Sequence, residues 1–158
     1  MIERLEQPGP RYRALLEWLR ASEAVWHASQ AFFGRWELSP SQFNILNLLG
    51  DQPAGLSQTE LSRELITHRS NVTGLVDRLE KRDLVTRRES ATDRRAWRVT
   101  LTARGKALLQ EILPQYYAVA EEVWGDVNVK RAETMATAGR LLEEQALRIA
   151  QRYQGKES

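Results

Sequence analysis

Apolar residues recur along most of the chain with the period of an α-helix. In residues 11–36, 103–124 and 129–153 they return at steps of three and four positions. This spacing predicts three long helices, each with an apolar seam along one side. Further apolar residues widen the seam of the first helix, so we expect that helix to pack against more than one neighbour.

Three shorter helices are predicted between the first long helix and residue 85. Residues 39–42 (SPSQ) and 57–60 (SQTE) are capping boxes, in which a serine and a Gln or Glu three residues later satisfy free N–H groups at a helix start. The third helix follows a tight turn at residues 66–67, and its apolar stripe is Val72, Leu75, Val76 and Leu79. Two short helices joined by a tight turn are typical of a helix-turn-helix.

The other face of this third helix carries side chains suited to the DNA major groove. Its members are Arg69, Ser70, Asn71, Thr73 and Arg78. Arginine pairs with two acceptors of guanine, asparagine pairs with adenine, and serine or threonine bonds to bases or phosphate. Taken alone, the same face is equally well explained as the solvated surface of an ordinary helix.

After Leu79 the apolar period changes to about two. Residues 84–89 and 97–101 therefore predict two strands, joined by a polar tip at residues 90–95. Residues 84–98 contain five arginines and two acidic residues. A hairpin beside a recognition helix is a wing, and arginines at its tip suit the negative potential of a minor groove. A merely solvated hairpin does not require so many arginines.

Composition excludes several classes of function. The chain has no cysteine and only two histidines, His27 and His68, so we expect no thiol chemistry, metal site or cofactor. Without a phosphate-binding loop or another catalytic motif, we expect no enzyme. No run of 18 apolar residues and no secretion signal occurs, which predicts a cytoplasmic protein with no membrane partner.

Charge is concentrated in the middle of the chain. Residues 63–98 contain ten basic and six acidic residues, whereas residues 1–62 contain five and seven, and residues 99–158 contain eight of each. The whole chain has a net charge of +2, so the excess is local. A local positive surface is expected of a protein that binds a polyanion.

These segments resemble the MarR family (multiple antibiotic resistance regulators) of winged helix-turn-helix proteins. The resemblance covers about residues 38–114 and is most specific in TDRRAWRVTLTARG, where the family's positions are Asp93, Arg95, Leu101, Thr102 and Gly105. It implies a mainly α (α+β) fold with about six helices and a two-stranded wing. It also implies a homodimer, with dimerisation helices in residues 11–37 and 103–153, a DNA-binding domain in residues 38–102, and flexible ends in residues 1–10 and 154–158.

The resemblance also implies how the chain contacts double-stranded DNA. The five polar residues of the third short helix would face the major groove or its phosphates. On the wing, Arg95 would enter the minor groove, Asp93 would hold its guanidinium, and Arg94 would reach a phosphate. Two such sets in a dimer predict a pseudo-palindromic operator with half-sites one helical turn, roughly 34 Å, apart. Asp83 departs from the glycine usual there, but aspartate tolerates the left-handed conformation better than most residues.

A small aromatic or phenolic effector is the least determined part of the resemblance. Family members are generally repressors of nearby genes, released by ligands that bind between the dimer helices and the winged domain. The aromatic and polar candidates near such a cleft are Trp18, Trp26, His27, Phe32, Phe43 and Tyr116. For most of them the simpler interpretation is core or dimer seam. A ligand-insensitive regulator and a winged helix used only for protein contacts remain as alternatives.

Overall fold

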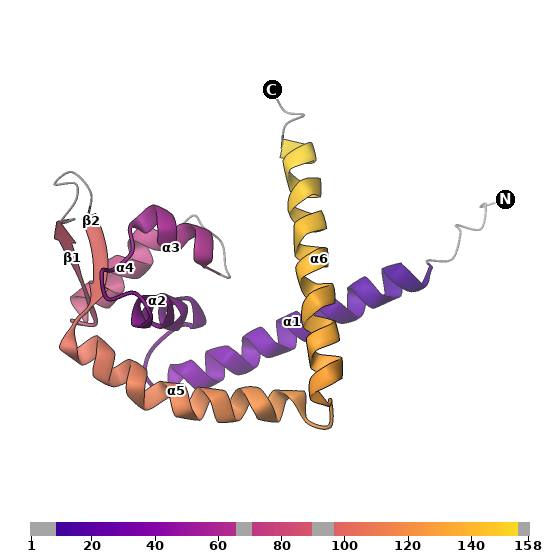
Figure 1. Cartoon of the computed structure of the whole chain (residues 1–158), viewed down its shortest axis with the longest axis horizontal. Coiled ribbons are helices and arrows are strands. Elements are labelled where there is room, and N and C mark those ends of the chain that lie inside the picture. Colours follow the sequence, from indigo (N-terminus) through magenta and orange to yellow (C-terminus); the bar gives the residue numbers. More distant parts are fainter. Residues whose placement is uncertain (1–8, 66–70, 90–96, 155–158) are drawn as a thin grey trace. The chain divides into compact units, whose positions relative to one another are not determined.

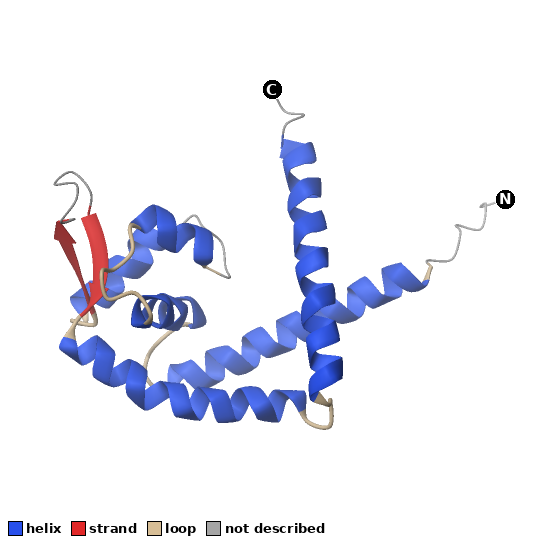
Figure 2. Ribbon diagram, viewed as in Figure 1, coloured by secondary structure: helices blue, strands red, loops and turns tan. Residues whose placement is uncertain are grey.

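The computed structural model describes residues 9–65, 71–89 and 97–154. Within these ranges the chain forms six helices and one two-stranded antiparallel sheet (Figure 1, Figure 2). In chain order the elements are α1 (Pro10–Gly34), α2 (Pro40–Gly50), α3 (Gln58–Glu64), α4 (Val72–Lys81), β1 (Val85–Glu89), β2 (Trp97–Leu101), α5 (Ala103–Trp124) and α6 (Val129–Gln154). The expected class, mainly helical with a two-stranded wing, is confirmed. The predicted flexible ends lie almost wholly outside the described residues.

Both predicted capping boxes are present at the starts of α2 and α3. The N–H of Gln42 donates to Ser39 Oγ at 3.2 Å, and the N–H of Ser39 donates to Gln42 Oε1 at 2.8 Å. Ser57 and Glu60 make the same two hydrogen bonds at 3.2 and 2.7 Å. Each box satisfies two N–H groups that the ends of a helix otherwise leave without partners. Local sequence therefore determines where these helices begin.

The helices α2, α3 and α4 and the two strands share one buried core. From α4 this core takes the whole predicted stripe, Val72, Leu75, Val76 and Leu79. From the other elements and their junctions it takes, among others, Ile45, Leu46, Leu61, Leu84, Val85 and Val99. Each fully buried aliphatic side chain stabilises the fold by about 1.5–3 kcal/mol. This core holds the helix-turn-helix against the hairpin.

The loop before α3 is attached to the edge of the hairpin. The N–H of Leu56 donates to the Val99 carbonyl at 3.0 Å, and the N–H of Val99 donates to the Leu56 carbonyl at 2.7 Å. Gly55 precedes this bridge with a φ of +75°, and a Cβ there would lie 2.4 Å from the Val99 oxygen. Glycine is required because it accepts the positive φ and leaves room for the backbone.

The end of α4 and the start of α5 meet at a tight junction. Asp83 has a φ of +55°, so the left-handed conformation expected at this position is confirmed, and Leu84 N–H bonds back to the Leu79 carbonyl at 3.0 Å. Thr102 Oγ1 donates to the Asp83 carbonyl at 2.6 Å and accepts from Gly105 N–H at 3.0 Å. A Cβ on Gly105 would lie 2.0 Å from the Leu84 oxygen. The Thr-x-x-Gly spacing therefore follows from this close approach.

The chain divides into two units, residues 1–114 and 115–158. In the second unit, Asn128 caps α6 by accepting from Arg131 N–H at 3.0 Å. No residue of α6 is buried, and its seam residues Met135, Leu142, Ile149 and Tyr153 are 40–62% exposed. The predicted division into a DNA-binding domain and dimerisation helices stays a prediction.

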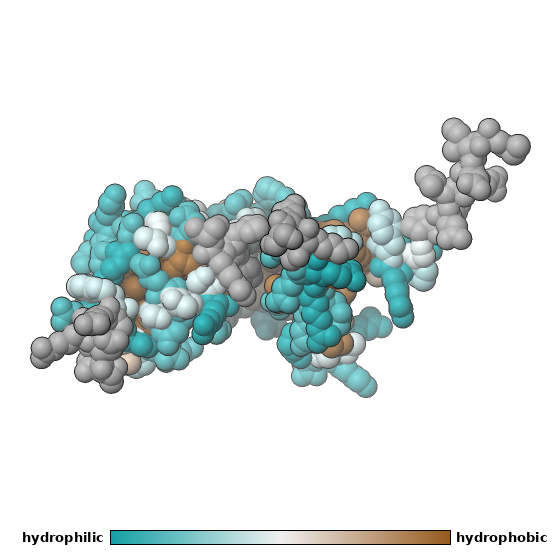
Figure 3. Space-filling view, turned by 90° about the horizontal axis from the view of Figure 1, so that it is seen from above, coloured by the Kyte–Doolittle hydropathy of each residue, from teal (hydrophilic) through white to brown (hydrophobic). Residues whose placement is uncertain are grey.

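In the first unit, α1 also leaves most of its apolar seam at the surface. Phe33 is its one buried residue, whereas Tyr12, Leu15 and Leu19 are 45–57% exposed. The space-filling view of Figure 3 shows brown apolar atoms among the teal polar ones on one face of the molecule. Helical seams of this kind are normally covered by another apolar surface.

Candidate nucleic-acid interface

The exposed side of α4 carries three of the five residues predicted to contact a major groove. Asn71, Thr73 and Arg78 are exposed, while the opposite face of the helix lies in the core. Arg69 and Ser70 lie outside the described residues. The described side therefore presents an amide, a hydroxyl and a guanidinium within about two turns. These groups match the donors and acceptors of base edges and phosphates.

The side chain of Asn71 lies over Gly74 at the start of α4. A Cβ on Gly74 would be 2.4 Å from Asn71 Oδ1, and Asn71 makes no side-chain capping hydrogen bond. Glycine usually destabilises the interior of a helix. Here it leaves room for the amide at the N-terminal end of α4, where free N–H groups favour anions such as phosphate.

Thr73 connects the two helices of the helix-turn-helix. Its hydroxyl donates to Gln58 Oε1 on α3 at 3.1 Å. A threonine hydroxyl also has two acceptor lone pairs, so this bond leaves Thr73 able to accept from another donor. The sequence placed Thr73 on the polar face but did not indicate its contact with α3.

The wing residues predicted to contact DNA, Asp93, Arg94 and Arg95, lie outside the described residues. The strands that lead to them, β1 and β2, are described and pair across five residues each. Arg88 on β1 is exposed near the end of the described hairpin.

Arg87 on β1 contacts both acidic residues of α4. Its Nη2 donates to Asp77 Oδ1 at 2.5 Å, its Nη1 donates to Glu80 Oε2, and its backbone N–H donates to Glu80 Oε1 at 3.0 Å. Burial by itself lowers the pKa of Arg87, but the hydrogen bonds and charges of Asp77 and Glu80 outweigh it and raise that pKa. The guanidinium therefore stays charged and bound to the protein.

Arg98 on β2 holds the loop that leads into α3. Its Nε donates to the carbonyls of Ala54 and Gly55, each at 3.1 Å, and its Nη2 donates to Gly55 at 2.6 Å. The same Nη2 lies 3.4 Å from Glu60 Oε2. The pKa of Glu60 is lowered, first by the hydrogen bond from Ser57 N–H, then by the Ser57 hydroxyl, with a smaller effect of the Arg98 charge.

These contacts correct one part of the sequence interpretation. That interpretation counted all five arginines of residues 84–98 as charges for DNA, but Arg87 and Arg98 are engaged by carboxylates and carbonyls of the protein. Part of the arginine content of the wing therefore has a structural cause, because guanidinium groups with several donors connect elements that are distant in sequence.

Two of the predicted effector residues belong to an aromatic cluster around the end of α1. Phe43 is 4% exposed and stacks on Phe33 with ring centroids 4.1 Å apart. Phe32 meets the edge of Phe33 and lies 5.3 Å from the ring of Trp36. Phe43 thus occupies the core, as the simpler interpretation expected.

The other predicted effector residues lie nearer the surface. Trp18 and Trp26 are half-buried on α1, and Tyr116 is half-buried on α5. His27 is exposed, with Nε2 3.3 Å from Glu23 Oε1 on the same helix. An effector role for these residues stays a prediction.

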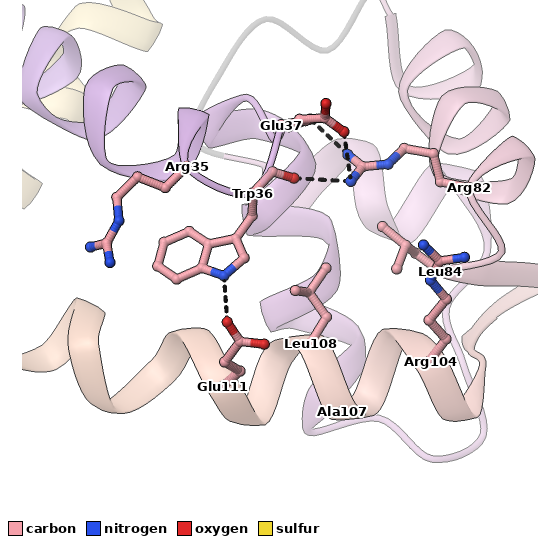
Figure 4. Close-up of a pocket in the computed structure, with 9 residues that line it drawn as sticks. All are labelled: Arg35, Trp36, Glu37, Arg82, Leu84, Arg104, Ala107, Leu108 and Glu111. Atoms are coloured by element: carbon pink, nitrogen blue, oxygen red, sulfur yellow. Dashed lines mark hydrogen bonds and ion pairs between the residues drawn. The ribbon is translucent and has the colours of Figure 1, made fainter.

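A hollow of about 530 Å³ opens beside the end of α1, the end of α4 and the first half of α5 (Figure 4). There Arg82 donates to the carbonyls of Trp36 and Glu37 at 2.9 and 2.6 Å, and the Trp36 indole donates to Glu111 Oε1 at 2.7 Å. Its lining is Arg35, Trp36, Glu37, Arg82, Leu84, Arg104, Ala107, Leu108 and Glu111. None of the predicted effector residues is among them.

Sequence reasoning missed this network because its members are far apart along the chain. Glu37 has a φ of +54°, a left-handed conformation that is uncommon for glutamate, and Arg82 binds its carbonyl. The one available signal was a tryptophan at the last position of the predicted helix over residues 11–36. Tryptophan carries a single N–H donor that usually finds a partner when partly buried.

Together these features define a class of protein. The helices α3 and α4 share a core with the hairpin β1–β2, the arrangement of a winged helix-turn-helix. Among the described residues, no three His, Asp or Glu side chains are grouped to hold a metal ion. No described helix is both long enough and apolar enough to cross a membrane.

Comparisons with known proteins agree with this class. The sequence profile of the MarR family matches residues 36–96. The transcriptional repressor YetL of Bacillus subtilis is 35% identical over 98 residues, which are 61% of this chain and 59% of YetL. The structure of BpsR from Bordetella bronchiseptica has a TM-score of 0.72 at 26% identity, covering 82% of this chain and 91% of BpsR. AbsC, a MarR family regulator of Streptomyces coelicolor, shares the fold with a TM-score of 0.78 at 18% identity, covering 91% and 99%.

Residues 36–96 therefore form a winged helix-turn-helix domain of the MarR family type. Proteins with this domain in the MarR family are transcriptional regulators that bind DNA. The sequence match spans less than two thirds of YetL, so what the whole protein binds and controls is a separate question.

Proposed function

We propose that this protein is a homodimeric repressor that binds a pseudo-palindromic operator and is released by a small aromatic ligand. The observation that carries DNA binding is the exposed side of α4, where Asn71, Thr73 and Arg78 project beside a hairpin that leads to Arg94 and Arg95. Two copies related by a two-fold axis would place these sets in major grooves roughly 34 Å apart.

In this proposal the exposed seams of α1 and α6 are where the two copies meet. Residues 11–37 and 103–153 supply the dimerisation helices, and residues 38–102 form the DNA-binding domain. Tyr12 and Leu19 of α1 and Leu142 and Ile149 of α6 are among the large apolar side chains left exposed. A second copy would cover them with surfaces of the same kind, as in other symmetric assemblies.

The DNA contacts divide between the two grooves. Arg69, Ser70, Asn71, Thr73 and Arg78 face the major groove or its phosphates. Arg95 enters the minor groove with its guanidinium held by Asp93, and Arg94 reaches a neighbouring phosphate. The phosphate contacts give affinity that falls with salt, and the base contacts give sequence preference.

Fluorescence anisotropy with the DNA upstream of the gene tests this proposal. Asn71→Ala and Arg95→Ala should each weaken binding about 5- to 150-fold, the effect of losing a contact worth about 1–3 kcal/mol. Arg148→Ala on α6 is the matched control and should bind like the parent. Parent-like binding by Asn71→Ala or Arg95→Ala would show that the residue has been misassigned.

The parent protein must also bind more weakly as salt rises, because phosphate contacts release counterions. A protein that fails to bind this DNA at both low and moderate salt would instead fit a winged helix used for protein contacts. The engagement of Arg87 and Arg98 by the protein favours that rival, since it leaves the hairpin less positive charge.

The effector part of the proposal rests on the half-buried aromatic residues of α1 and α5 and on one relative. The DNA binding of BpsR is regulated by 6-hydroxynicotinic acid, a small aromatic acid. We expect a ligand of this class to contact Trp18, Trp26, His27 or Tyr116 and to favour a state that binds DNA poorly. Phe43 was a further candidate, and its place in the core would give it a supporting role.

Titration of the protein–DNA complex with salicylate and with 6-hydroxynicotinate tests the effector. Either compound should release DNA from the parent at concentrations where benzyl alcohol, an uncharged aromatic control, does not. His27→Ala should raise the concentration needed for release without changing DNA affinity. Unchanged binding with both acids would favour a ligand-insensitive regulator for this class of compound.

A further inference from the structure

One guanidinium joins the first strand of the hairpin to the recognition helix. Asp77 and Glu80 are the two acidic residues of α4, and Arg87 bonds to both. The Arg87 side chain is 22% exposed, much less than an arginine on an open hairpin surface. A backbone hydrogen bond from Arg87 N–H to Glu80 makes the attachment part of the strand itself.

The exposed surface of α4 has two edges. Asp77 and Glu80 follow Thr73 by four and seven positions, so these three lie along the edge beside α3 and the hairpin. Arg78 lies along the other edge of the same exposed surface, and Asn71 precedes the helix. Successive side chains of a strand point to opposite faces, so Arg88 points away from Asp77 and Glu80 and is exposed.

Stability alone does not account for this arrangement. The Asp77 and Glu80 side chains are 49% and 37% exposed, and ion pairs exposed to this degree contribute little to folding. Near DNA the same carboxylates would face phosphates and oppose binding. A guanidinium that binds both of them holds them toward the hairpin and keeps a positive charge beside them.

We propose that Arg87 is a positioning residue for DNA binding: it fixes the wing against α4 through Asp77 and Glu80 without touching DNA. The helix and the wing then approach adjacent grooves as one rigid body. Their relative orientation costs no ordering entropy when the complex forms. This inference rests on the proposed DNA-binding function and adds a residue to it that lies behind the contact surface.

A mutant cycle with the upstream DNA tests whether Arg87 acts through the carboxylates. Arg87→Gln and the pair Asp77→Asn with Glu80→Gln should each weaken binding about tenfold. In the background of that pair, Arg87→Gln should change the affinity less than twofold, because its partners are already lost. An equal loss in both backgrounds would mean that Arg87 contacts DNA directly and would overturn the proposal. So would parent-like or tighter binding by the pair, since the carboxylates would then only repel DNA.

Arg88→Gln is the matched control, because it removes the same charge from the next residue of the strand. Its effect should be the same in both backgrounds, since Arg88 does not act through Asp77 or Glu80. If Arg88 contacts a phosphate, Arg88→Gln also reduces the steepness of log K plotted against log salt concentration (the salt slope) by about one. Arg87→Gln should leave that slope within about 0.3 of the parent value. If Arg87→Gln instead reduced the salt slope by about one, Arg87 would contact a phosphate itself, and its positioning role would be overturned.

Hydrogen exchange of the free protein gives a readout that does not depend on DNA. The amide of residue 87 should exchange at least tenfold faster in Arg87→Gln, whereas Arg88→Gln should leave it unchanged. Unchanged exchange in Arg87→Gln would mean that the side chain does not hold the strand, and the inference fails. If the parent protein does not bind its DNA, the proposed function fails, and the exchange data still decide whether Arg87 joins strand and helix.

Discussion

The helices α4 and α6 have the same apolar period but opposite burial. The four stripe residues of α4 are at most 8% exposed, whereas the four seam residues of α6 are at least 40% exposed. For α4 the rest of the winged domain supplies the covering surface. The seam of α6 has no such cover in the described chain. A helical seam therefore predicts that a partner surface is needed, but not which molecule provides it.

The largest effect is expected from a substitution in the apolar seam of α6, which we propose to be part of the dimer interface. Leu142→Glu would place a carboxylate in the seam of each copy, and we expect the dimer Kd to rise more than 100-fold, about 3 kcal/mol. Sedimentation equilibrium measures this change. Glu143→Gln, the next residue along the helix, is the control and should remain dimeric. A dimeric Leu142→Glu protein would remove α6 from the interface.

In α4, by contrast, a core replacement should act within one chain. Leu79→Ala leaves a cavity in the winged domain and should lower the free energy of unfolding by about 3 kcal/mol. Urea denaturation at two protein concentrations should give the same difference between parent and variant. A difference that changed with concentration would mean that Leu79 also contributes to association.

A smaller effect is expected where the backbone itself leaves no room. Gly105→Ala places a Cβ against the Leu84 carbonyl, and the start of α5 must shift. We expect Gly105→Ala to lower the free energy of unfolding by about 2 kcal/mol. Gly34→Ala is the matched control, because a Cβ there meets nothing within 4 Å. Thermal unfolding compares the two, and an equal small change in both would contradict a close junction.

A still smaller effect should follow from Trp36→Phe. This change removes the indole N–H that donates to Glu111 but keeps an aromatic ring. We therefore expect it to lower the free energy of unfolding by about 1 kcal/mol. Glu111→Ala should cost a similar amount, and the double variant should cost no more than either single one. Additive losses in urea denaturation would show that the bond contributes nothing.

The smallest effect concerns pH and Glu60. Because its pKa is lowered in the folded protein, Glu60 stabilises the fold above its unfolded pKa, and this contribution is lost as the pH falls through the folded pKa. Glu60→Gln keeps an oxygen that can accept the capping hydrogen bond. Because the Glu60 side chain is partly exposed, the substitution should lower the free energy of unfolding at neutral pH by less than about 1 kcal/mol. At acidic pH the two proteins should converge in stability. A constant difference across pH would exclude the carboxylate charge as its cause.

Much of the fold could be predicted from the sequence, because the positions of helices and strands depend largely on interactions between residues that are close along the chain. The capping boxes at Ser39 and Ser57 and the change of period after Leu79 placed helices and strands close to where they lie. The polar side of α4 was likewise predicted from spacing, and Asn71, Thr73 and Arg78 are exposed there. Hydrogen bonds within a helix turn, and side-chain direction along a helix, are set locally.

The sequence by itself determined the order of elements, the buried stripe of α4 and the need of three long helices for apolar partners. Only the tertiary structure decided that Arg87 and Arg98 bind the protein, that Gly105 faces a carbonyl, and that Trp36 and Arg82 frame a hollow. The sequence does not distinguish an arginine that binds a DNA phosphate from one that binds a carboxylate of the protein. Its role depends on which distant residues the fold brings within hydrogen-bond distance.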